Sequence, residues 1–218
     1  MGIGAGHDRG WVIVALRETL TATFFSFVLA TVAGVGFSLV VGLSRFWADV
    51  WEPILVWVYS IPKVVLYPVV ILLFGISLNA SIAFAFISAV FPVAIIAFGA
   101  VRAIPPILLK VAASYRLSTW KVFFEVVLPV AAPSIATAAR YSFCLSFLGV
   151  IVGEMLGTRQ GMGQELFKAI ALNDIARIFG IALLLSRSRW RSTPDWHSSN
   201  AASAAGPGWS ETPERKAR

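Results

Sequence analysis

Charged residues are scarce in this chain: Asp, Glu, Lys and Arg make up 13% of its 218 residues, and hydrophobic residues make up 58%. A soluble domain of this size carries about a quarter charged residues. None lies between Glu18 and Arg45 or between Lys63 and Arg102, and Arg140 alone lies between Glu125 and Glu154. Because roughly 20 apolar residues cross a ~30 Å hydrocarbon core, each stretch is long enough to span a bilayer.

Other scarce features exclude further classes of protein. The single cysteine, Cys144, lies in an apolar run, where it is expected to fill space in a core. The two histidines, His7 and His197, stand near opposite ends, so no metal or catalytic cluster is visible. No phosphate loop of the type G-x-x-x-x-G-K-[ST] occurs. We therefore expect no enzyme, no cofactor bound by this chain and no metal.

The net charge of +7 raises the question of nucleic acid. The basic residues, however, stand in short loops beside apolar stretches, where cytoplasmic Lys and Arg collect in membrane proteins. The first ten residues do not form a basic-then-apolar signal peptide. We therefore expect no nucleic-acid partner, and insertion is expected to depend on the first spanning helix.

The apolar stretches predict an all-α bundle of helices that crosses the membrane several times. Spans are expected at about 20–43, 53–75, 80–101 and 126–152, with an incomplete span at 175–185. Residues 1–19 would be an extracytoplasmic or interfacial N-terminus, and Gly75–Asn79 a tight turn. The loop 102–125 carries four basic residues against one acid, which places it in the cytoplasm.

The first span is rich in small residues, namely Ala30, Ala33, Gly34, Gly36 and Gly42. Small residues let helix backbones approach closely in lipid. Glycine is also common in membrane helices without such a contact. For each small residue taken singly, a close helix contact and this general tolerance of glycine are equally supported.

The second span is interrupted by Pro62, Lys63 and Pro68. Proline removes a backbone donor, and a lysine inside a span is costly unless it snorkels or faces a polar cavity. One reading is a break in the helix on the side of a pore. The other is that the helix begins only after Pro62, which leaves Lys63 at the interface.

The last stretch changes character at residue 186, because residues 186–218 contain no Leu, Ile, Val, Phe or Met. Such a composition cannot bury enough apolar surface to fold. Residues 186–218 are therefore expected to be either a disordered cytoplasmic tail or an out-of-frame tail that follows a lost reading frame near Leu185. The second reading is favoured because an apolar helix starts and then stops within the membrane.

The basic loop has its own pattern. After Ser118, a candidate helix cap, apolar residues recur at helical spacing from Trp120 to Ala131. A short helix at about 107–115 is expected before the cap. Two short helices with one apolar and one basic face can lie on the membrane surface and contact a cytoplasmic partner. The alternative is a loop that merely connects two spans.

The ordered motifs resemble those of permeases from binding-protein-dependent ABC importers, in the nitrate/sulfonate/taurine-type branch. The loop is similar to that family's "EAA" coupling segment, with Ala112 on its second alanine and Leu128-Pro129 at its end. Further matches are Ser60-Ile61-Pro62, Tyr67-Pro68, Phe74-Gly75, Ala132 to Ile135, Arg140, Gly153 to Gly157 and Gly161 to Gly163. The resemblance covers about residues 18–185.

The sequence departs from this family at three positions of the loop. Lys110 stands where the family has Glu, Val111 replaces the first alanine, and Arg116 replaces a glycine that suits a left-handed turn. Either the turn is differently shaped here or coupling is impaired. The family also has a further span before Leu20 and a complete one after Asn173.

The resemblance implies a type I ABC importer transmembrane domain at residues 20–185, located in the bacterial inner membrane. It implies a homodimer that lines a path for a small anion or organic nutrient, a cytoplasmic ATPase subunit that carries the ATP, and an extracytoplasmic solute-binding protein. The residues implied for ATPase coupling are Ala112, Ala113, Arg116, Leu117, Trp120, Lys121, Phe123, Leu128 and Pro129. Those implied for the pore or binding-protein side are Pro62, Lys63, Pro68, Arg140 and Glu154, although Glu154 also reads as a simple interfacial acid.

Two other functions are weighed against this one. An ion-coupled transporter or channel would carry acids inside its spans and an inverted repeat, and neither is visible in the predicted spans. A non-transporting membrane scaffold or an inactive fragment is the third reading. A neighbouring ATPase gene would separate the importer from both.

Overall fold

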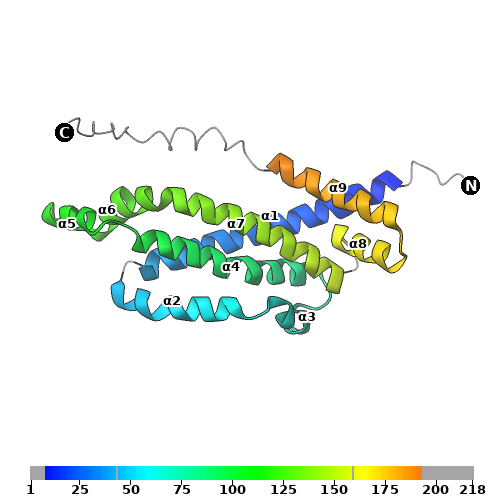
Figure 1. Cartoon of the computed structure of the whole chain (residues 1–218), viewed down its shortest axis with the longest axis horizontal. Helices are drawn as coiled ribbons and strands as arrows, with labels where there is room; N and C mark the ends of the chain where they lie inside the picture. The colour runs from blue at the N-terminus through cyan, green and yellow to red at the C-terminus, as the bar shows by residue number, and fades with distance from the viewer. Residues whose placement is uncertain (1–7, 43, 159, 193–218) are drawn as a thin grey trace, which may run out of the picture. The chain divides into compact units, whose positions relative to one another are not determined.

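The computed structural model describes residues 8–42, 44–158 and 160–192. They fall into two compact units, which divide after Asp174 and are described separately. All regular elements in these ranges are helical (Figure 1). The first unit contains α1 Asp8–Gly42, α2 Arg45–Ser60, α3 Tyr67–Phe74, α4 Leu78–Arg102, α5 Pro106–Ser114, α6 Thr119–Val122, α7 Leu128–Gly157 and α8 Met162–Ala171. The second contains α9 Ile175–Ser192.

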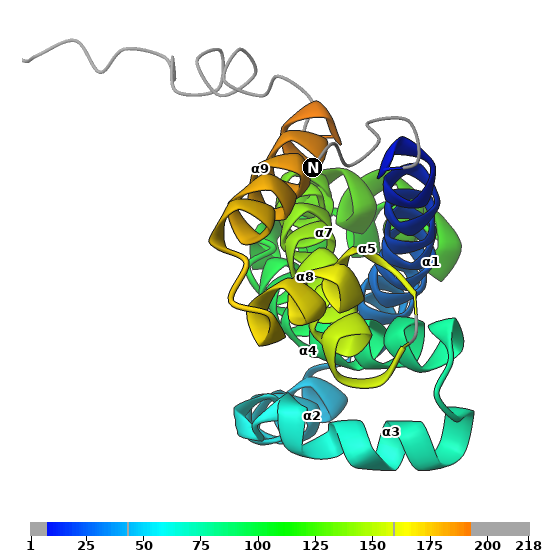
Figure 2. The ribbon, with the colours of Figure 1, turned by 90° about the vertical axis from the view of Figure 1, so that its right-hand side faces the viewer.

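Within the described ranges, three helices are long and apolar enough to cross a membrane: Gly10–Gly42, Leu78–Arg102 and Trp120–Gly157. They belong to α1, α4 and α7, which lie side by side in the first unit (Figures 1 and 2). The prediction of an all-α membrane helix bundle is confirmed.

Helix α4 packs between α1 and α7 through small residues. A Cβ atom added to Gly149 on α7 would lie 2.7 Å from the Cα of Ala85, and one added to Gly34 on α1 would lie 2.9 Å from the carbonyl oxygen of Val90. Backbones therefore touch at both contacts, as expected where small residues let membrane helices associate. Of the small residues in the first span, Ala30 is buried as well, whereas Ala33 and Gly36 are exposed.

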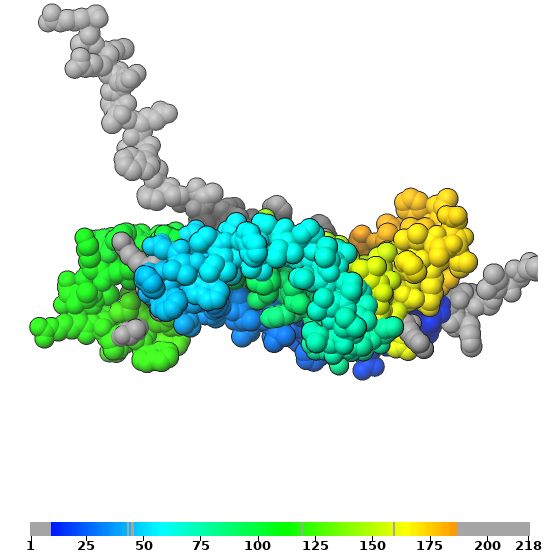
Figure 3. Space-filling model, turned by 90° about the horizontal axis from the view of Figure 1, so that it is seen from below, coloured from blue at the N-terminus to red at the C-terminus, as the bar shows by residue number. Residues whose placement is uncertain are grey.

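The second predicted span is a broken one. Helix α2 ends at Ser60, a short 3-10 turn covers Lys63–Leu66, and α3 follows, with a bend of 82° between the two halves. The break at Pro62 is confirmed, and the reading in which the helix begins only after Pro62 is wrong. Pro68 bends nothing, because it stands in the first turn of α3, where its missing N–H is tolerated. Figure 3 shows α2 and α3 covering the face seen from below.

Two helices begin well before the predicted spans. Helix α1 begins at Asp8 rather than near Leu20, so most of the predicted N-terminal segment is helical, and residues 1–7 lie outside the described part. The helix of the fourth span starts at Thr119, because α6 continues through a π-helical turn, Phe123–Val127, into α7. Both extensions contain charged residues, so the charge-free stretches from which the spans were predicted did not include them.

Two further elements differ from the sequence prediction. The amphipathic helix α8 was not predicted, and α9 continues seven residues past Leu185, to Ser192. The apolar part of α9, Ile175–Ser186, is shorter than the candidate spans. The predicted tail is therefore helical at its start, and residues 193–218 lie outside the described part.

The contact between Gly149 and Ala85 generates a first prediction. Gly149→Ala is expected to destabilise the bundle by about 1–3 kcal/mol, because the new methyl group forces two backbones apart. The measurement is the thermal unfolding midpoint in detergent. The matched control is Gly36→Ala, where no atom lies within 4 Å of the added Cβ. Equal midpoints for both variants would contradict the close approach.

Candidate functional site

The first candidate site is a segment at one end of the bundle, residues 105–127, called here the projecting segment. It contains α5, a turn, α6 and the π-helical turn. In Figure 1 it lies beyond the Arg102 end of α4. The expected pair of short helices joined by a turn is confirmed, and the second of them is continuous with α7.

The turn between α5 and α6 has the left-handed geometry that glycine favours. Arg116 has a φ of 50°. The N–H of Arg116 donates to the carbonyl oxygen of Ala113 at 3.0 Å, and that of Leu117 to Ala112 at 3.2 Å. These are the two hydrogen bonds of a Schellman cap. The arginine thus adopts the conformation expected of the family's glycine, so the turn is not differently shaped.

One face of the projecting segment packs inward. Ala112 is only 3% exposed, and Val127 is fully buried. Val127 forms a core cluster with Leu39, Val101 and Ile104, and Val122, Phe123 and Leu128 pack against that cluster. Ala112 is thus buried and Phe123 half-buried within the chain, and their expected contact with an ATPase stays a prediction.

The other face is exposed and mixes aromatic with basic side chains. Its members are Lys110, Val111, Tyr115, Arg116, Trp120, Lys121 and Phe124, called here the aromatic–basic face. Trp120 is 75% and Tyr115 77% exposed, and the Trp120 ring stacks on Phe124 with centroids 6.4 Å apart. Ala113 and Pro129 are exposed too, and Leu117 is half-buried. Among the residues expected for coupling, these exposed ones are available to a partner.

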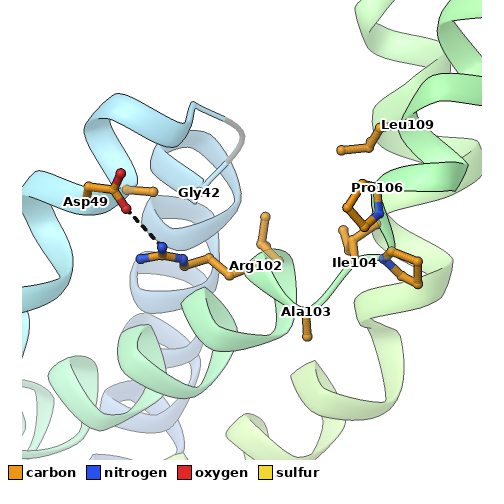
Figure 4. Close-up of a pocket in the computed structure, with 10 residues that line it drawn as sticks. Gly42, Asp49, Arg102, Ala103, Ile104, Pro106 and Leu109 are labelled. Carbon is orange, nitrogen blue, oxygen red and sulfur yellow. Dashed lines mark hydrogen bonds and ion pairs between the residues drawn. The ribbon is translucent and has the colours of Figure 1, made fainter.

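An ion-pair cluster connects the start of α2 to the end of α4. The Arg102 guanidinium donates to Asp49 at 2.9 Å and also to Glu52. A cleft of about 380 Å³ opens beside it, with Pro106 and Leu109 of the projecting segment on its other wall (Figure 4). The broken span and the projecting segment therefore meet at this cleft. The sequence prediction assigned no role to Arg102.

The residues expected on the pore or binding-protein side are not brought together into one site. Lys63 donates to the carbonyl oxygen of Tyr59 at 3.0 Å and lies 3.8 Å from the centroid of its ring. Pro62 and Pro68 are exposed beside it. Arg140 stands half-buried within α7, on a different helix.

The Glu154 side chain is fully buried among helices of the first unit, and its expected role at a pore mouth, a binding protein or the membrane interface stays a prediction. The Thr19 hydroxyl lies 2.9 Å from both carboxylate oxygens, and the N–H of Gly163 donates to Oε2 at 2.9 Å. The N–H of Met162 donates to the Thr19 hydroxyl at 3.0 Å. These four residues, the Glu154 cluster, fasten the N-terminus of α8 to α1 and α7.

The carboxylate of Glu154 lies within a spanning helix, which is the feature that an ion-coupled transporter would display. Its partners are the structural ones of the Glu154 cluster, including backbone N–H groups at a helix N-terminus, which favour negative charge. One residue earlier, the carbonyl oxygen of Gly153 accepts a 2.5 Å hydrogen bond from the buried Tyr67 hydroxyl of α3. Glu154 therefore has a structural explanation and does not favour ion coupling.

Sequence reasoning missed Thr19 and Tyr67 as parts of this arrangement. Their spacing from residue 154 carries no local signal, because the contacts join helices that are far apart in the chain. The glycines at 161 and 163 were the available clue, since a Cβ on either would collide with Glu154.

The left-handed Arg116 generates a second prediction. Arg116→Gly is expected to stabilise the turn by about 1 kcal/mol, because glycine adopts positive φ without a steric penalty. The measurement is amide hydrogen exchange at Leu117, which should slow roughly fivefold. Asn173→Gly is the matched control: Asn173 has a φ of 53°, which asparagine tolerates better. Equal slowing in both variants, or none at Leu117, would contradict strain at Arg116.

The Glu154 cluster generates a third prediction. Glu154→Ala is expected to destabilise the protein by about 1–3 kcal/mol, because it leaves the buried N–H of Gly163 without an acceptor and removes the contact with Thr19, whose hydroxyl keeps the carbonyl oxygen of Ala15 as an acceptor. Glu154→Gln keeps an acceptor oxygen and should lose less. Thermal unfolding in detergent measures both, with exposed Glu125→Ala as the control. The cluster would lose its assigned role if Glu154→Ala unfolded at the temperature of the control.

Comparison with known proteins places these features in a family. The family described as "binding-protein-dependent transport system inner membrane component" matches residues 26–186. Similar proteins include a nitrate import permease of Leptolyngbya laminosa (30% identity, covering 76% of this chain and 59% of that protein). A bicarbonate transport system permease of Synechococcus elongatus is also 30% identical (84% and 68%). A taurine transport system permease of Escherichia coli is 26% identical (84% and 70%). The chain thus spans about three fifths to seven tenths of these relatives.

A solved structure supports the fold. Inward-facing conformations of the MetNI methionine ABC transporter include a chain that matches with a TM-score of 0.61 at 21% identity, over 88% of this chain and 100% of that one. This likeness confirms the expected ABC transporter transmembrane fold. The matched family region covers well over half of the sequence. The chain therefore belongs to the binding-protein-dependent transport system inner membrane components and is a multi-pass inner-membrane protein.

Proposed function

We propose that this chain is the membrane-spanning permease subunit of an ATP-driven importer and that it docks on a separate ATPase through the projecting segment. The observation that carries the proposal is the aromatic–basic face. Monomeric soluble proteins rarely expose large contiguous apolar patches, and such patches mark sites of interaction with proteins, membranes or ligands. Trp120 and Phe124 are stacked and exposed, as anchors for a partner groove are expected to be.

The same segment is built to move as one body with the spans. Its inner face packs on Leu39 of α1 and Val101 of α4, and its second helix runs without a break into α7. A displacement of the docked face would therefore tilt α7 directly. Closure of an ATPase pair would drive rigid-body switching between inward-open and outward-open states.

The broken span would follow the same movement. Arg102 at the end of α4 holds Asp49 and Glu52 at the start of α2, so a shift near residue 105 acts on α2 through these ion pairs. Exposed pairs of this kind contribute little to stability singly, but two acids on one guanidinium restrict its position.

The proposed assembly contains two copies of this permease, an extracytoplasmic solute-binding protein and ATPase subunits that bind the ATP. The substrate class we propose is a small anion or an organic nutrient. It rests on the relatives that are named for nitrate, bicarbonate and taurine. Uptake of isotope-labelled nitrate, bicarbonate and taurine by cells expressing the whole transporter distinguishes among these solutes.

The fourth prediction tests docking. Trp120→Ala and Ala113→Glu are each expected to weaken association with the ATPase subunit at least about tenfold, because one removes an anchor and the other buries a charge at the contact. The measurement is co-purification from co-expressing cells with the subunit from the same genome, identified by its phosphate loop. Ala113 replaces Ala112 as the test position because Ala112 is buried within the chain.

The matched control is Ala171→Glu, an exposed alanine at the end of α8, away from the projecting segment. It makes the same chemical change and should leave association intact. Membrane insertion, checked by fractionation, should be normal in all variants. Undiminished ATPase recovery with both Trp120→Ala and Ala113→Glu would overturn the docking proposal.

A further inference from the structure

The aromatic–basic face carries a positive charge that no ion pair within the described residues neutralises. Lys110, Arg116 and Lys121 are exposed, and none of them forms an ion pair among the described residues. Glu125 is the one acid in the projecting segment, and it is exposed as well. The face therefore presents three cations against one carboxylate.

Arg102 provides the contrast within the same end of the molecule. Its guanidinium binds two carboxylates, Asp49 and Glu52, so its charge is compensated by the chain. The acids of α2 are thus engaged with Arg102. The charges of Lys110, Arg116 and Lys121 are not compensated within the described residues, so they can form ion pairs with another molecule.

The length of the helix that carries Trp120 leaves room for a protein partner rather than lipid headgroups. Val127 packs with Val101 and Ile104, so residues 120–126 extend beyond the end of α4. The continuous helix Trp120–Gly157 has 38 residues, or about 57 Å at 1.5 Å per residue. A bilayer with its headgroups is about 40–45 Å thick. A helix of this length is longer than the bilayer is thick, so a protein partner can reach one of its ends.

We propose that the partner is an ATPase subunit whose docking groove has an apolar floor for Trp120 and Phe124 and a rim of carboxylates for Lys110 and Lys121. This deepens the proposed function and rests on it. Opposite charge across such an interface sets partner choice and association rate. Lys110 stands where the resembling family has glutamate, so the groove matched to this chain has the opposite sign at that point. An ATPase matched to the family's usual segment would meet repulsion there.

The experiment is a double charge reversal, Lys110→Glu with Lys121→Glu. Arg116 stays unchanged so that the left-handed turn is not disturbed. The full chain is reconstituted in nanodiscs, and its affinity is measured for the ATPase subunit that co-purifies with the wild-type chain. The matched control reverses two exposed cations at the other end of the first unit, Arg17→Glu with Lys168→Glu.

The expected result is a loss of at least about tenfold in affinity at low salt for the double reversal, with the control unchanged. Wild-type affinity should fall as salt rises, because exposed charges are screened. Replacing rim carboxylates of the ATPase by lysine should restore binding to the reversed chain and weaken binding to the wild type. Such an exchange of preference is specific to paired charges and would not follow from misfolding.

Three outcomes overturn the inference. If the wild-type chain binds the ATPase and the double reversal binds it equally well, the acidic groove is wrong while the proposed function stands. If the wild-type chain binds no ATPase, the proposed function fails and the inference with it. The last arm of the experiment tests for lipid binding. A fluorophore is attached to the cysteine of a Ser114→Cys variant, in which Cys144→Ser removes the natural cysteine, and its fluorescence is measured as phosphatidylglycerol is added. A response to phosphatidylglycerol that the double reversal abolishes, with ATPase affinity unchanged, would assign the face to lipid.

Discussion

Close contact between α4 and its two neighbours is the constraint on which the rest of the structure depends. In a membrane, lipid tails are as apolar as the side chains, so burying apolar side chains between helices gains no hydrophobic free energy. Helices therefore associate through close packing and hydrogen bonds. Gly34 and Gly149 permit that packing on opposite sides of α4, and the Ser38 hydroxyl adds a 2.8 Å hydrogen bond to the carbonyl oxygen of Ala94. The two ends of the bundle are then held by different chemistry.

At one end of the bundle, the buried carboxylate of Glu154 connects α1, α7 and α8. At the other end, the apolar cluster around Val127 and the guanidinium of Arg102 hold the helices together. The Glu154 cluster uses hydrogen bonds that have no competition from water, so it resists separation. The Arg102 pairs are partly exposed and weaker. The two ends of the bundle therefore differ in how strongly they resist separation.

The sequence predicted the elements that bilayer thickness determines and missed those that depend on tertiary contacts. Charge-free stretches located α4 to within two residues at its start and one at its end, because its length matches the hydrocarbon core. They placed the start of α1 too late, since Arg17 and Glu18 lie in its polar extension. The resemblance implied contacts with other molecules for Ala112 and Glu154, but it does not reveal which neighbour within the chain covers each side chain. The burial of Glu154 depends on contacts with Thr19 and α8, and no local sequence pattern encodes these contacts.

The departures of the projecting segment from the resembling family change its charge more than its shape. Arg116 adopts the left-handed conformation without glycine, and the Schellman hydrogen bonds of Ala112 and Ala113 are complete. The penalty of positive φ, about 1 kcal/mol, is small against the packing of Val127 and its neighbours. Arginine in place of glycine and lysine in place of glutamate therefore preserve the geometry of the turn and reverse part of the charge of the segment. A change of that kind alters the electrostatics of the proposed docking surface rather than the fold of the segment.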